Sequence, residues 1–526
     1  MIGLFTDFYN YFFLLVSLFY NLFSKKIRPL LLLIVSFLFF YLLSSQLVIC
    51  LLMTILSVYF SALLFKRIEK DKKNALENVE ADEKKQIKSF YQKRKKYILI
   101  LCILFNFLFL FLYKYLGFFA GIGNGILHGI GISFQFPIFK LIAPIGISFY
   151  TLQAYSYLLD VYNGKIEADD NFYRVALFIS FFPQIVEGPM ARYSDTALDL
   201  YSGEKITYHN FCFGLQRIAW GILKKVVIAD RINILVKTIF NDYAIYSGPI
   251  CFLGALGYTI MLYMEFSSTM DVVIGIGEIF GVTIPENFRQ PFFSKNISEF
   301  WTRWHISLGL WFKDYIYYPI SLSKPLKKIT VSARKVVGNH FGPLISGTIS
   351  LFVVWFLNGL WHGAGWTFLL FGMYHFLLIF LENLLEPFLQ SLRLKMKIQS
   401  ENTFYRVFCF MKVVFLVVIG ELIFRAPTVE VAFHMLHKIF SNFHFKASEI
   451  ATLGLDLPDY FILIFSICLV FLVSILKEKN ISIREVIGKQ NIVIRWILYY
   501  LLIFYIIVFG AYGAGYQPID PIYADF

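Results

Sequence analysis

Charged residues are scarce in this chain for its length. Asp, Glu, Lys and Arg make up 16% of the 526 residues, whereas 58% are hydrophobic, 60 residues are Phe and the mean hydropathy is +0.65. A water-soluble protein could not bury so much apolar surface, and this composition excludes a disordered chain, a coiled coil and a secreted disulfide scaffold. Because about 20 apolar residues can cross a bilayer as a helix, we predict an all-α, polytopic integral membrane protein.

Cysteine pairs and the common catalytic motifs are missing as well. The six cysteines stand singly in apolar runs without a Cys-x-x-Cys pair, which predicts packing residues rather than a disulfide frame or a zinc site. The sequence has no P-loop, no HExxH, no GxSxG and no GxGxxG before a helix, so the usual nucleotide-binding, zinc-protease and hydrolase sites are not indicated. His434, His437 and His444 lie close in sequence, but nothing around them supports a metal site. We expect no bound metal or cofactor.

The excess of positive charge predicts how the chain is oriented. Lys and Arg number 48 against 35 Asp and Glu, a net charge of +13. Loops that face an anionic leaflet explain this excess better than nucleic acid does, so membrane lipids are expected partners and nucleic acid is not. Basic residues follow the first apolar run at 25–28, are absent after the second run at about 29–43, and return in the segment 66–96. This alternation places the N-terminus outside and the segment 66–96, with a helix of its own, in the cytoplasm.

Four regions follow from these patterns. We expect N-terminal transmembrane helices in 1–65, a charged cytoplasmic segment in 66–96, a membrane core in 97–511 and an extracytoplasmic tail in 512–526. Further basic clusters, which predict cytoplasmic loops, lie at 324–335, 393–397 and 477–489. The apolar runs suggest roughly eleven to thirteen transmembrane or re-entrant helices.

The middle of the chain, from 172 to 300, has short apolar runs. These runs are interrupted by Pro183, Gly188, Pro189, Gly254, Gly257 and Pro285. A broken helix is tolerated inside a membrane only where protein or water covers the backbone, so we expect a cavity to be built there.

Polar residues recur within the apolar part of the chain. They gather in five clusters, at 144–160, 181–193, 263–288, 300–315 and 358–366. Ionisable groups at membrane depth are costly and therefore suggest function. The side chains that we expect to line a funnel or a substrate site are Arg192, Asp271, Trp304, Asn358 and Trp361.

The cluster 300–315 has helical spacing. One stripe of a helix would carry Trp301, His305, Leu308, Phe312 and Tyr315. The pattern predicts a continuous helix along the membrane interface, with His305 on its inner, aromatic face. An aromatic anchor belt that holds a structural histidine explains the same pattern.

The cluster 358–366 contains His362 between the apolar runs 342–361 and 366–386. The surrounding residues Gly359, Gly363 and Gly365 would let a backbone or a substrate approach closely, and Trp361 and Trp366 could exclude water. A desolvated imidazole stays neutral near pH 7 and can take a proton from a hydroxyl, as acyl transfer requires. A core histidine bonded to a helix carbonyl remains an equal alternative.

At these two clusters the sequence resembles a known family. WTRWHISLGLWFKDYIYYP and NGLWHGAGWTF resemble the two histidine motifs of the membrane-bound O-acyltransferases, in the bacterial branch of alginate and peptidoglycan O-acetyltransferases and teichoic acid D-alanyl transfer proteins. Further blocks that resemble this branch are PIGISFYTLQAYSYLLDVY, FFPQIVEGPMARY, MDVVIGIGEIFG and IPENF, and the resemblance runs from about residue 140 onward. The stretch from Glu265 to Asp271 and the position of Lys313 depart from the usual pattern, which leaves the substrate open.

The resemblance implies a fold, a site and a function. The fold would be a ring of membrane helices around a central funnel, with His362 as the catalytic residue and His305 as a supporting one. The function would be transfer of an acyl group, most simply acetyl from cytoplasmic acetyl-CoA, across the bacterial cytoplasmic membrane for O-acylation of a cell-envelope polysaccharide. An extracytoplasmic transferase of the SGNH/GDSL-like type would be the partner.

Two alternatives remain open. D-alanyl transfer to teichoic acids, from a thioester on a carrier protein, is the alternative within the enzyme class. A polysaccharide or small-molecule transporter is the alternative from another class, because helices broken by Gly and Pro that carry buried ionisable residues suit transport.

The tail 512–526 contains no Lys or Arg and ends in GYQPIDPIYADF. It resembles an aromatic-x-Tyr-x-x-Phe motif of the same branch, in which Tyr523 and Phe526 match while Pro521 replaces the first aromatic residue. The resemblance implies that Tyr523 accepts the acyl group before a partner transferase receives it. A tail that only plugs the funnel, or docks the partner, is the alternative.

Overall fold

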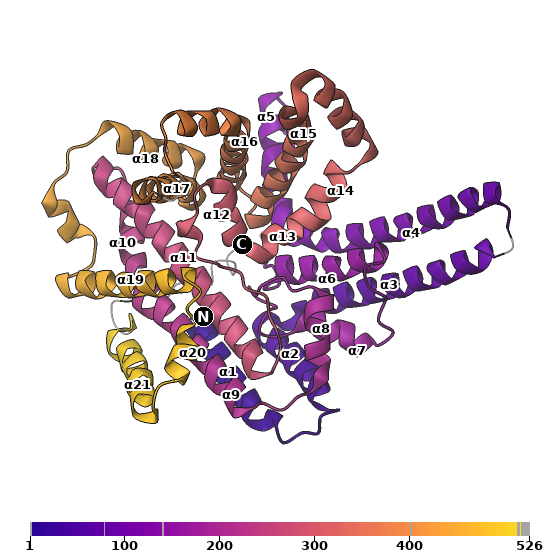
Figure 1. Ribbon diagram of the computed structural model, residues 1–526, viewed down its shortest axis with the longest axis horizontal. Coiled ribbons are helices and arrows are strands. Elements are labelled where there is room, and N and C mark those ends of the chain that lie inside the picture. The colour runs from indigo at the N-terminus through magenta and orange to yellow at the C-terminus, as the bar shows by residue number, and fades with distance from the viewer. Residues whose placement is uncertain (1–2, 78, 139–140, 400–401, 513–515, 517–526) are drawn as a thin grey trace. The chain divides into compact units, whose positions relative to one another are not determined.

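The computed structural model describes residues 3–77, 79–138, 141–399, 402–512 and 516, and it is built of helices (Figure 1). The described residues contain no β-strand, and extended pairing is limited to one isolated bridge between Phe288 and Trp304. The expectation of an all-α chain is confirmed.

The elements follow one another with short connections. Up to residue 162 they are α1 (Gly3–Tyr20), α2 (Arg28–Ser44), the 3-10 turn η1 (Ser45–Leu47), α3 (Val48–Leu76), α4 (Ala81–Leu110), the π-helix η2 (Phe111–Tyr115), α5 (Leu116–Gly129) and α6 (Ile147–Tyr162). Up to residue 303 they are α7 (Phe172–Ser180), α8 (Tyr193–Ser202), α9 (Tyr208–Ile222), the π-helix η3 (Leu223–Ala229), α10 (Asp230–Asn241), α11 (Gly248–Ile279), the 3-10 turn η4 (Pro291–Phe293) and α12 (Ile297–Arg303). The remainder are α13 (Ile306–Phe312), the π-helix η5 (Lys313–Tyr317), α14 (Tyr318–Ser321), α15 (Lys324–His362), α16 (Trp366–Lys395), α17 (Thr403–Arg425), α18 (Val429–Ser441), the 3-10 turn η6 (Ala447–Thr452), α19 (Leu457–Glu478), α20 (Ile483–Gly488) and α21 (Ile492–Phe509).

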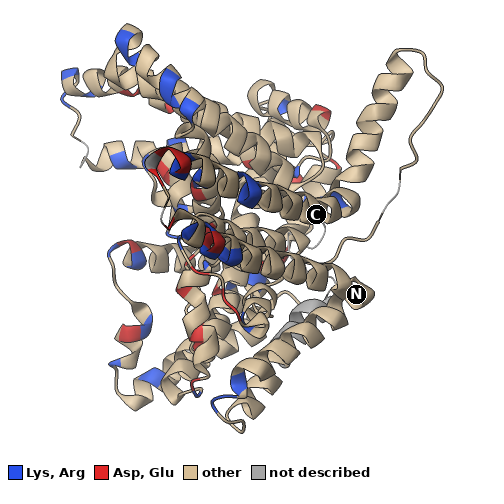
Figure 2. Ribbon diagram, turned by 90° about the vertical axis from the view of Figure 1, so that its right-hand side faces the viewer, with Lys and Arg blue, Asp and Glu red and all other residues tan. Residues whose placement is uncertain are grey.

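Eight helical segments of the described chain are long and apolar enough to cross a membrane. They are Arg28–Leu76, Asp82–Gly129, Gly248–Ile279, Lys324–His362, Trp366–Lys395, Thr403–Arg425, Leu457–Glu478 and Ile492–Phe509. In Figure 2, long stretches of ribbon without charge separate the Lys and Arg residues. The polytopic membrane protein predicted from composition is confirmed. The first two segments hold two helices each, and several apolar runs between 172 and 241 form shorter helices.

The chain divides into two compact units. The first unit contains the described parts of 1–7, 213–275 and 286–516, and the second contains 8–212 and 276–285. The charged segment 66–96 belongs to the second unit and holds the ends of α3 and α4, which lie side by side (Figure 1). The helix predicted in this segment is formed by the charged ends of α3 and α4, which continue past their apolar parts. The 29 residues of α3 span about 43 Å, more than the ~30 Å of a hydrocarbon core. An ion pair between Lys95 and Glu69 (2.9 Å) ties the two helices together.

In the first unit, α11 runs unbroken through Gly254 and Gly257, which corrects the expectation that these glycines interrupt it. They serve close packing against α10 instead. A Cβ on Gly254 would lie 2.6 Å from the side chain of Ile239, and one on Gly257 would lie 3.2 Å from that of Leu235. The predicted break is real in the second unit, where the residues between α7 and α8 are irregular and almost all buried.

Candidate active site

His362 is the last residue of α15, and three residues turn the chain into α16. The two helices can cross closely because glycines stand at the contact. A Cβ on Gly359 would lie 2.6 Å from the carbonyl oxygen of Phe368, and one on Gly372 would lie 2.4 Å from that of Trp355. His362 is 6% exposed. The prediction of a buried histidine in a glycine-rich turn is confirmed.

Aromatic rings surround the imidazole of His362. Its ring centroid lies 5.1 Å from that of Trp361, 6.0 Å from that of Phe371 and 5.3 Å from that of Phe424. Trp366, the other residue expected to exclude water, is 60% exposed. Phe424 is one of the surrounding rings although it is distant in the sequence. These rings make the site around His362 apolar.

His305 lies where a helix breaks. α12 ends at Arg303 and α13 begins at Ile306, with His305 between them in the left-handed region at φ 48° and ψ 50°. The continuous helix predicted over 301–315 is therefore wrong. The physical reason is Asn287, which supplies competing acceptors. Its carbonyl oxygen accepts from the backbone N–H of Ile306 (3.0 Å), and its side-chain oxygen accepts from that of Ser307 (3.0 Å).

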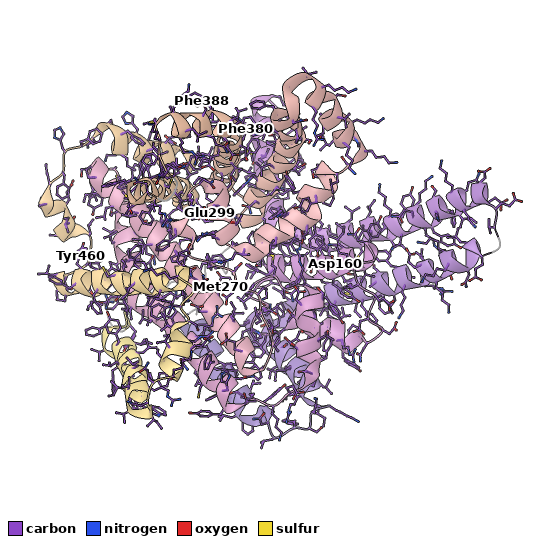
Figure 3. The ribbon with its side chains drawn as sticks, in the orientation of Figure 1. Asp160, Met270, Glu299, Phe380, Phe388 and Tyr460 are labelled. Carbon is purple, nitrogen blue, oxygen red and sulfur yellow. The ribbon has the colours of Figure 1, made fainter. Side chains whose placement is uncertain are left out.

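The two histidines line one cavity of about 890 Å³ between α12 and α16. Trp304 and Asn358, both predicted from the sequence, line it as well, and so does Phe380, which is labelled in Figure 3. The ring of Trp361 contacts both histidines, with its centroid 5.9 Å from that of His305 and 5.1 Å from that of His362. The structure thus brings together two histidines that are 57 positions apart in the sequence.

The cavity wall carries little charge. Among its described residues, Lys313 is the single side chain with a formal charge, and none is Asp or Glu. Tyr317, Tyr318 and His340 lie along the same wall. Burial lowers the pKa of His305 well below its usual range, and a charge on His362 would lower it further. At neutral pH the cavity therefore offers a neutral imidazole at His305 and a wall suited to neutral or anionic ligands.

A third histidine, His375, contacts Trp301, a residue of the cavity wall. It is fully buried on α16, and its Nδ1 accepts a hydrogen bond of 3.2 Å from the indole N–H of Trp301. Its ring also stacks on Trp355 at 5.5 Å. His375 does not line the cavity. This pairing could not be predicted from the sequence, because no helical or strand spacing relates positions 301 and 375.

Asp271 belongs to an ion network rather than to the wall of this cavity. Its two carboxylate oxygens lie 3.0 Å from Nε of Arg217 and 2.8 Å from Nζ of Lys224. Arg217 also pairs with Glu286 (2.6 Å). The network encloses a polar space of about 50 Å³, which Asn287 also lines. Asp271, which the sequence predicted as a site residue, thus lies near Asn287, and Asn287 contacts His305.

The other predicted site residues lie elsewhere. Arg192 belongs to the second unit, where it precedes α8 and is partly buried. Tyr523 lies outside the described residues. His434 and His437 lie on α18, and the described residues contain no group of three metal-ligating side chains.

Known proteins resemble this chain in sequence. Residues 166–334, which include His305 but not His362, match the model of the membrane-bound O-acyltransferase family. A Pseudomonas aeruginosa protein named "Probable alginate O-acetylase AlgI" is 36% identical over 340 residues, which cover 64% of this chain and 60% of that protein. The peptidoglycan O-acetyltransferase of Helicobacter pylori is 33% identical, over 46% of this chain and 47% of its own. The teichoic acid D-alanyltransferase of Bacillus subtilis is 33% identical, over 48% of this chain and 61% of its own.

The matches to individual relatives are longer than the match to the family model, but they do not cover the full length of those relatives. The chain spans 60%, 60% and 64% of the length of three alginate O-acetylases. The resemblance found in the sequence is confirmed: residues 166–334 match the model of the membrane-bound O-acyltransferase family, and the chain is homologous to bacterial proteins named for O-acetyl and D-alanyl transfer.

Proposed function

We propose that this protein is an O-acyltransferase that moves an acetyl group from cytoplasmic acetyl-CoA across the bacterial cytoplasmic membrane toward a cell-envelope polysaccharide. The observation that carries the proposal is the cavity that His305 and His362 share, in a chain whose relatives transfer acyl groups. Two of the three kinds of relative are named for O-acetylation, which favours acetyl as the group transferred.

The chemistry follows from two imidazoles in an apolar enclosure. His362 polarises or deprotonates the acceptor hydroxyl, whose oxygen then attacks the carbonyl carbon of the thioester. The tetrahedral intermediate collapses, the C–S bond breaks, and the thiolate leaves with the proton that the hydroxyl released. A site without nearby water protects the thioester from hydrolysis. The positive charge of Lys313 on the cavity wall suits a donor that carries phosphate groups.

The orientation supports a cytoplasmic donor. α15 folds back on itself at Gly338 (φ 81°), and its part from 339 to 362 forms a hairpin with α16, so Arg334 and Lys335 next to that turn lie on the same side as the basic end of α16. A cytoplasmic location of this side agrees with the positive-inside rule. A separate extracytoplasmic transferase of the SGNH/GDSL-like type would then receive the acyl group on the opposite side. D-alanyl transfer from a carrier-protein thioester remains the second candidate, because a teichoic acid D-alanyltransferase is among the relatives.

The test is thioester turnover by the purified protein in liposomes. We expect the wild type to release free thiol from acetyl-CoA in the presence of an acceptor, and His362→Ala to lose about 10²–10⁴-fold of this rate. His437→Ala, which removes an exposed imidazole from α18 of the same unit, is the matched control and should keep the rate. A His362→Ala rate within a few fold of wild type would refute the catalytic role. Turnover of a D-alanyl carrier thioester but not of acetyl-CoA would favour the second candidate, and turnover of neither would favour a transporter.

A further inference from the structure

Asn287 holds His305 through a fully buried side chain. Its Oδ1 lies 3.0 Å from the backbone nitrogen of Ser307, 2.9 Å from the hydroxyl oxygen of Ser307 and 3.3 Å from Nδ1 of His305. Its Nδ2 lies 3.1 Å from the sulfur of Met270, which is labelled on α11 in Figure 3. The side chain of Asn287 thus connects α11, the start of α13 and the imidazole.

These contacts fix which end of the amide faces His305. A backbone N–H can only donate, so the atom of Asn287 that faces Ser307 must be the oxygen. A thioether sulfur can only accept, so the atom that faces Met270 must be the NH₂ group. The contacts with Ser307 and with Met270 require the same orientation of the Asn287 amide. This orientation is therefore assigned without reference to the imidazole of His305. Nδ1 of His305 therefore faces an oxygen that can only accept.

The tautomer of His305 follows from this acceptor. Two acceptors cannot bond to each other, so Nδ1 carries the hydrogen and donates to Asn287. A neutral imidazole has one N–H, and Nε2 on the opposite edge of the ring then carries a lone pair. Because burial disfavours the charged ring, this neutral tautomer prevails at pH 7. His305 lines the cavity, and Nε2, although itself buried, is its accepting nitrogen.

We propose that Asn287 is a positioning residue that holds His305 in the tautomer with hydrogen on Nδ1, so that Nε2 accepts the proton of the acceptor hydroxyl. This role rests on the proposed acyl transfer and makes His305 the proton acceptor, which goes beyond the supporting role that the resemblance implies. The O–H bond of the acceptor breaks as an N–H bond forms at Nε2. The resulting positive charge is stabilised by the Asn287 oxygen at Nδ1, and the proton passes to the leaving thiolate when the C–S bond breaks. His362 then polarises the reacting groups by hydrogen bonding.

Substitutions at Asn287 separate this role from simple packing. Asn287→Asp keeps an accepting oxygen and adds a negative charge that stabilises the imidazolium, which raises the pKa of His305. The acid limb of the pH–rate profile should therefore move to higher pH, with the rate above that limb kept within about tenfold of wild type. Asn287→Leu removes the acceptor and should lower kcat on the order of 10²-fold or more, with KM for the thioester unchanged. Equal losses in the two variants, or an unshifted profile for Asn287→Asp, would overturn the proposal.

Ser307→Ala is the matched control. It removes a hydroxyl that donates to the same oxygen but keeps the backbone N–H of residue 307 and the contact between Asn287 and His305. We expect its acid limb to stay at the wild-type pH. A shift as large as that of Asn287→Asp would show that any disturbance of the amide moves the profile, which would contradict the specific role of Asn287.

A spectroscopic test does not depend on activity. Histidine labelled with ¹⁵N at Nε2 alone would be incorporated into the whole protein in liposomes, and the His305 signal would be assigned by its loss in His305→Gln. We expect an Nε2 without attached hydrogen at neutral pH in the wild type and in Asn287→Asp, and a hydrogen-bearing or mixed signal in Asn287→Leu. An Nε2 that carries hydrogen in the wild type would overturn the inference even if acyl transfer is confirmed. If His305 shows the expected tautomer but the protein does not turn over a thioester, only the proposed function is contradicted and the inference about Asn287 stands.

Discussion

At the scale of single residues, the left-handed backbone of His305 allows stability and chemistry to be tested separately. Asn adopts this conformation readily, whereas Ala pays roughly 1–2 kcal/mol for it. We therefore expect His305→Asn to unfold near the wild-type temperature and His305→Ala to unfold at a lower one, as measured by tryptophan fluorescence. Both should lose about 10²–10⁴-fold of acyl-transfer activity, because neither side chain can take up a proton. If His305→Asn keeps substantial activity, a donor hydrogen bond is the role of His305 instead.

The sequence was sufficient to predict both histidines but not the residues that orient them. His305 and His362 lie in local patterns that can be recognised within a few residues. Asn287 lies 18 residues from His305 in the sequence. His375 lies 74 residues from Trp301, whose indole N–H donates to it. Periodicity also predicted a continuous helix through position 305, because it does not account for a distant acceptor that takes over the first N–H groups of α13. Local spacing thus indicated the two candidate histidines, while tertiary hydrogen bonds determine how they are oriented.

At the scale of elements, the hairpin of α15 and α16 sets the position of His362. Gly359→Ala would place a methyl group 2.6 Å from the carbonyl oxygen of Phe368, so the helices must separate. Overpacking of this kind costs about 1–3 kcal/mol, and a displacement of ~1 Å at a reacting group can cost on the order of 10²-fold in rate. We expect Gly359→Ala to lose activity with His362 intact, measured as thioester turnover in liposomes.

The control is Gly125→Ala on α5, where an added Cβ meets no atom within 4 Å. Alanine is favoured over glycine in a helix by up to ~1 kcal/mol, so this variant should be as active and at least as stable as the wild type. An equal loss in the two variants would mean that the effect does not come from the helix crossing. Apolar runs and basic flanks predicted where α15 and α16 lie, but the role of the glycines at their crossing depends on a partner helix that the sequence does not name.

At the scale of the whole molecule, the positions of Lys and Arg predict which ends of the helices face the cytoplasm. A cysteine introduced at Ala75, next to the turn between α3 and α4, should react with a membrane-impermeant thiol reagent only from the cytoplasmic side. A cysteine at His444, in the exposed connection after α18, should react only from the outside. The six native cysteines must first be replaced, since one of them, Cys468, is exposed. Labelling of both positions from one side would contradict the predicted topology.

The chain that leads to Tyr523 is fastened to the first unit at Tyr516. The Tyr516 hydroxyl donates to Oδ1 of Asp459 (2.8 Å), and Nε of Arg231 donates to the same oxygen (2.9 Å). Asp459 is itself fixed in the capping box at the start of α19. Tyr523 is seven positions beyond Tyr516, so its Cα can lie at most about 25 Å from that of Tyr516. The anchor therefore limits where an acyl group on Tyr523 could be formed and delivered.

We expect Tyr523 to carry the acyl group between the thioester and the extracytoplasmic partner. A tyrosine hydroxyl has a pKa of about 10 and is a weak nucleophile at pH 7, so it needs an imidazole of the cavity to remove its proton. Tyr523→Phe keeps the ring and removes only the hydroxyl, and it should abolish polymer acylation while expression stays normal. In the wild type without its partner, labelled acetyl should accumulate on a C-terminal peptide, as detected by mass spectrometry. Wild-type acylation by Tyr523→Phe would leave the tail a structural role, because a plug or a docking segment needs the shape of the ring and not its oxygen.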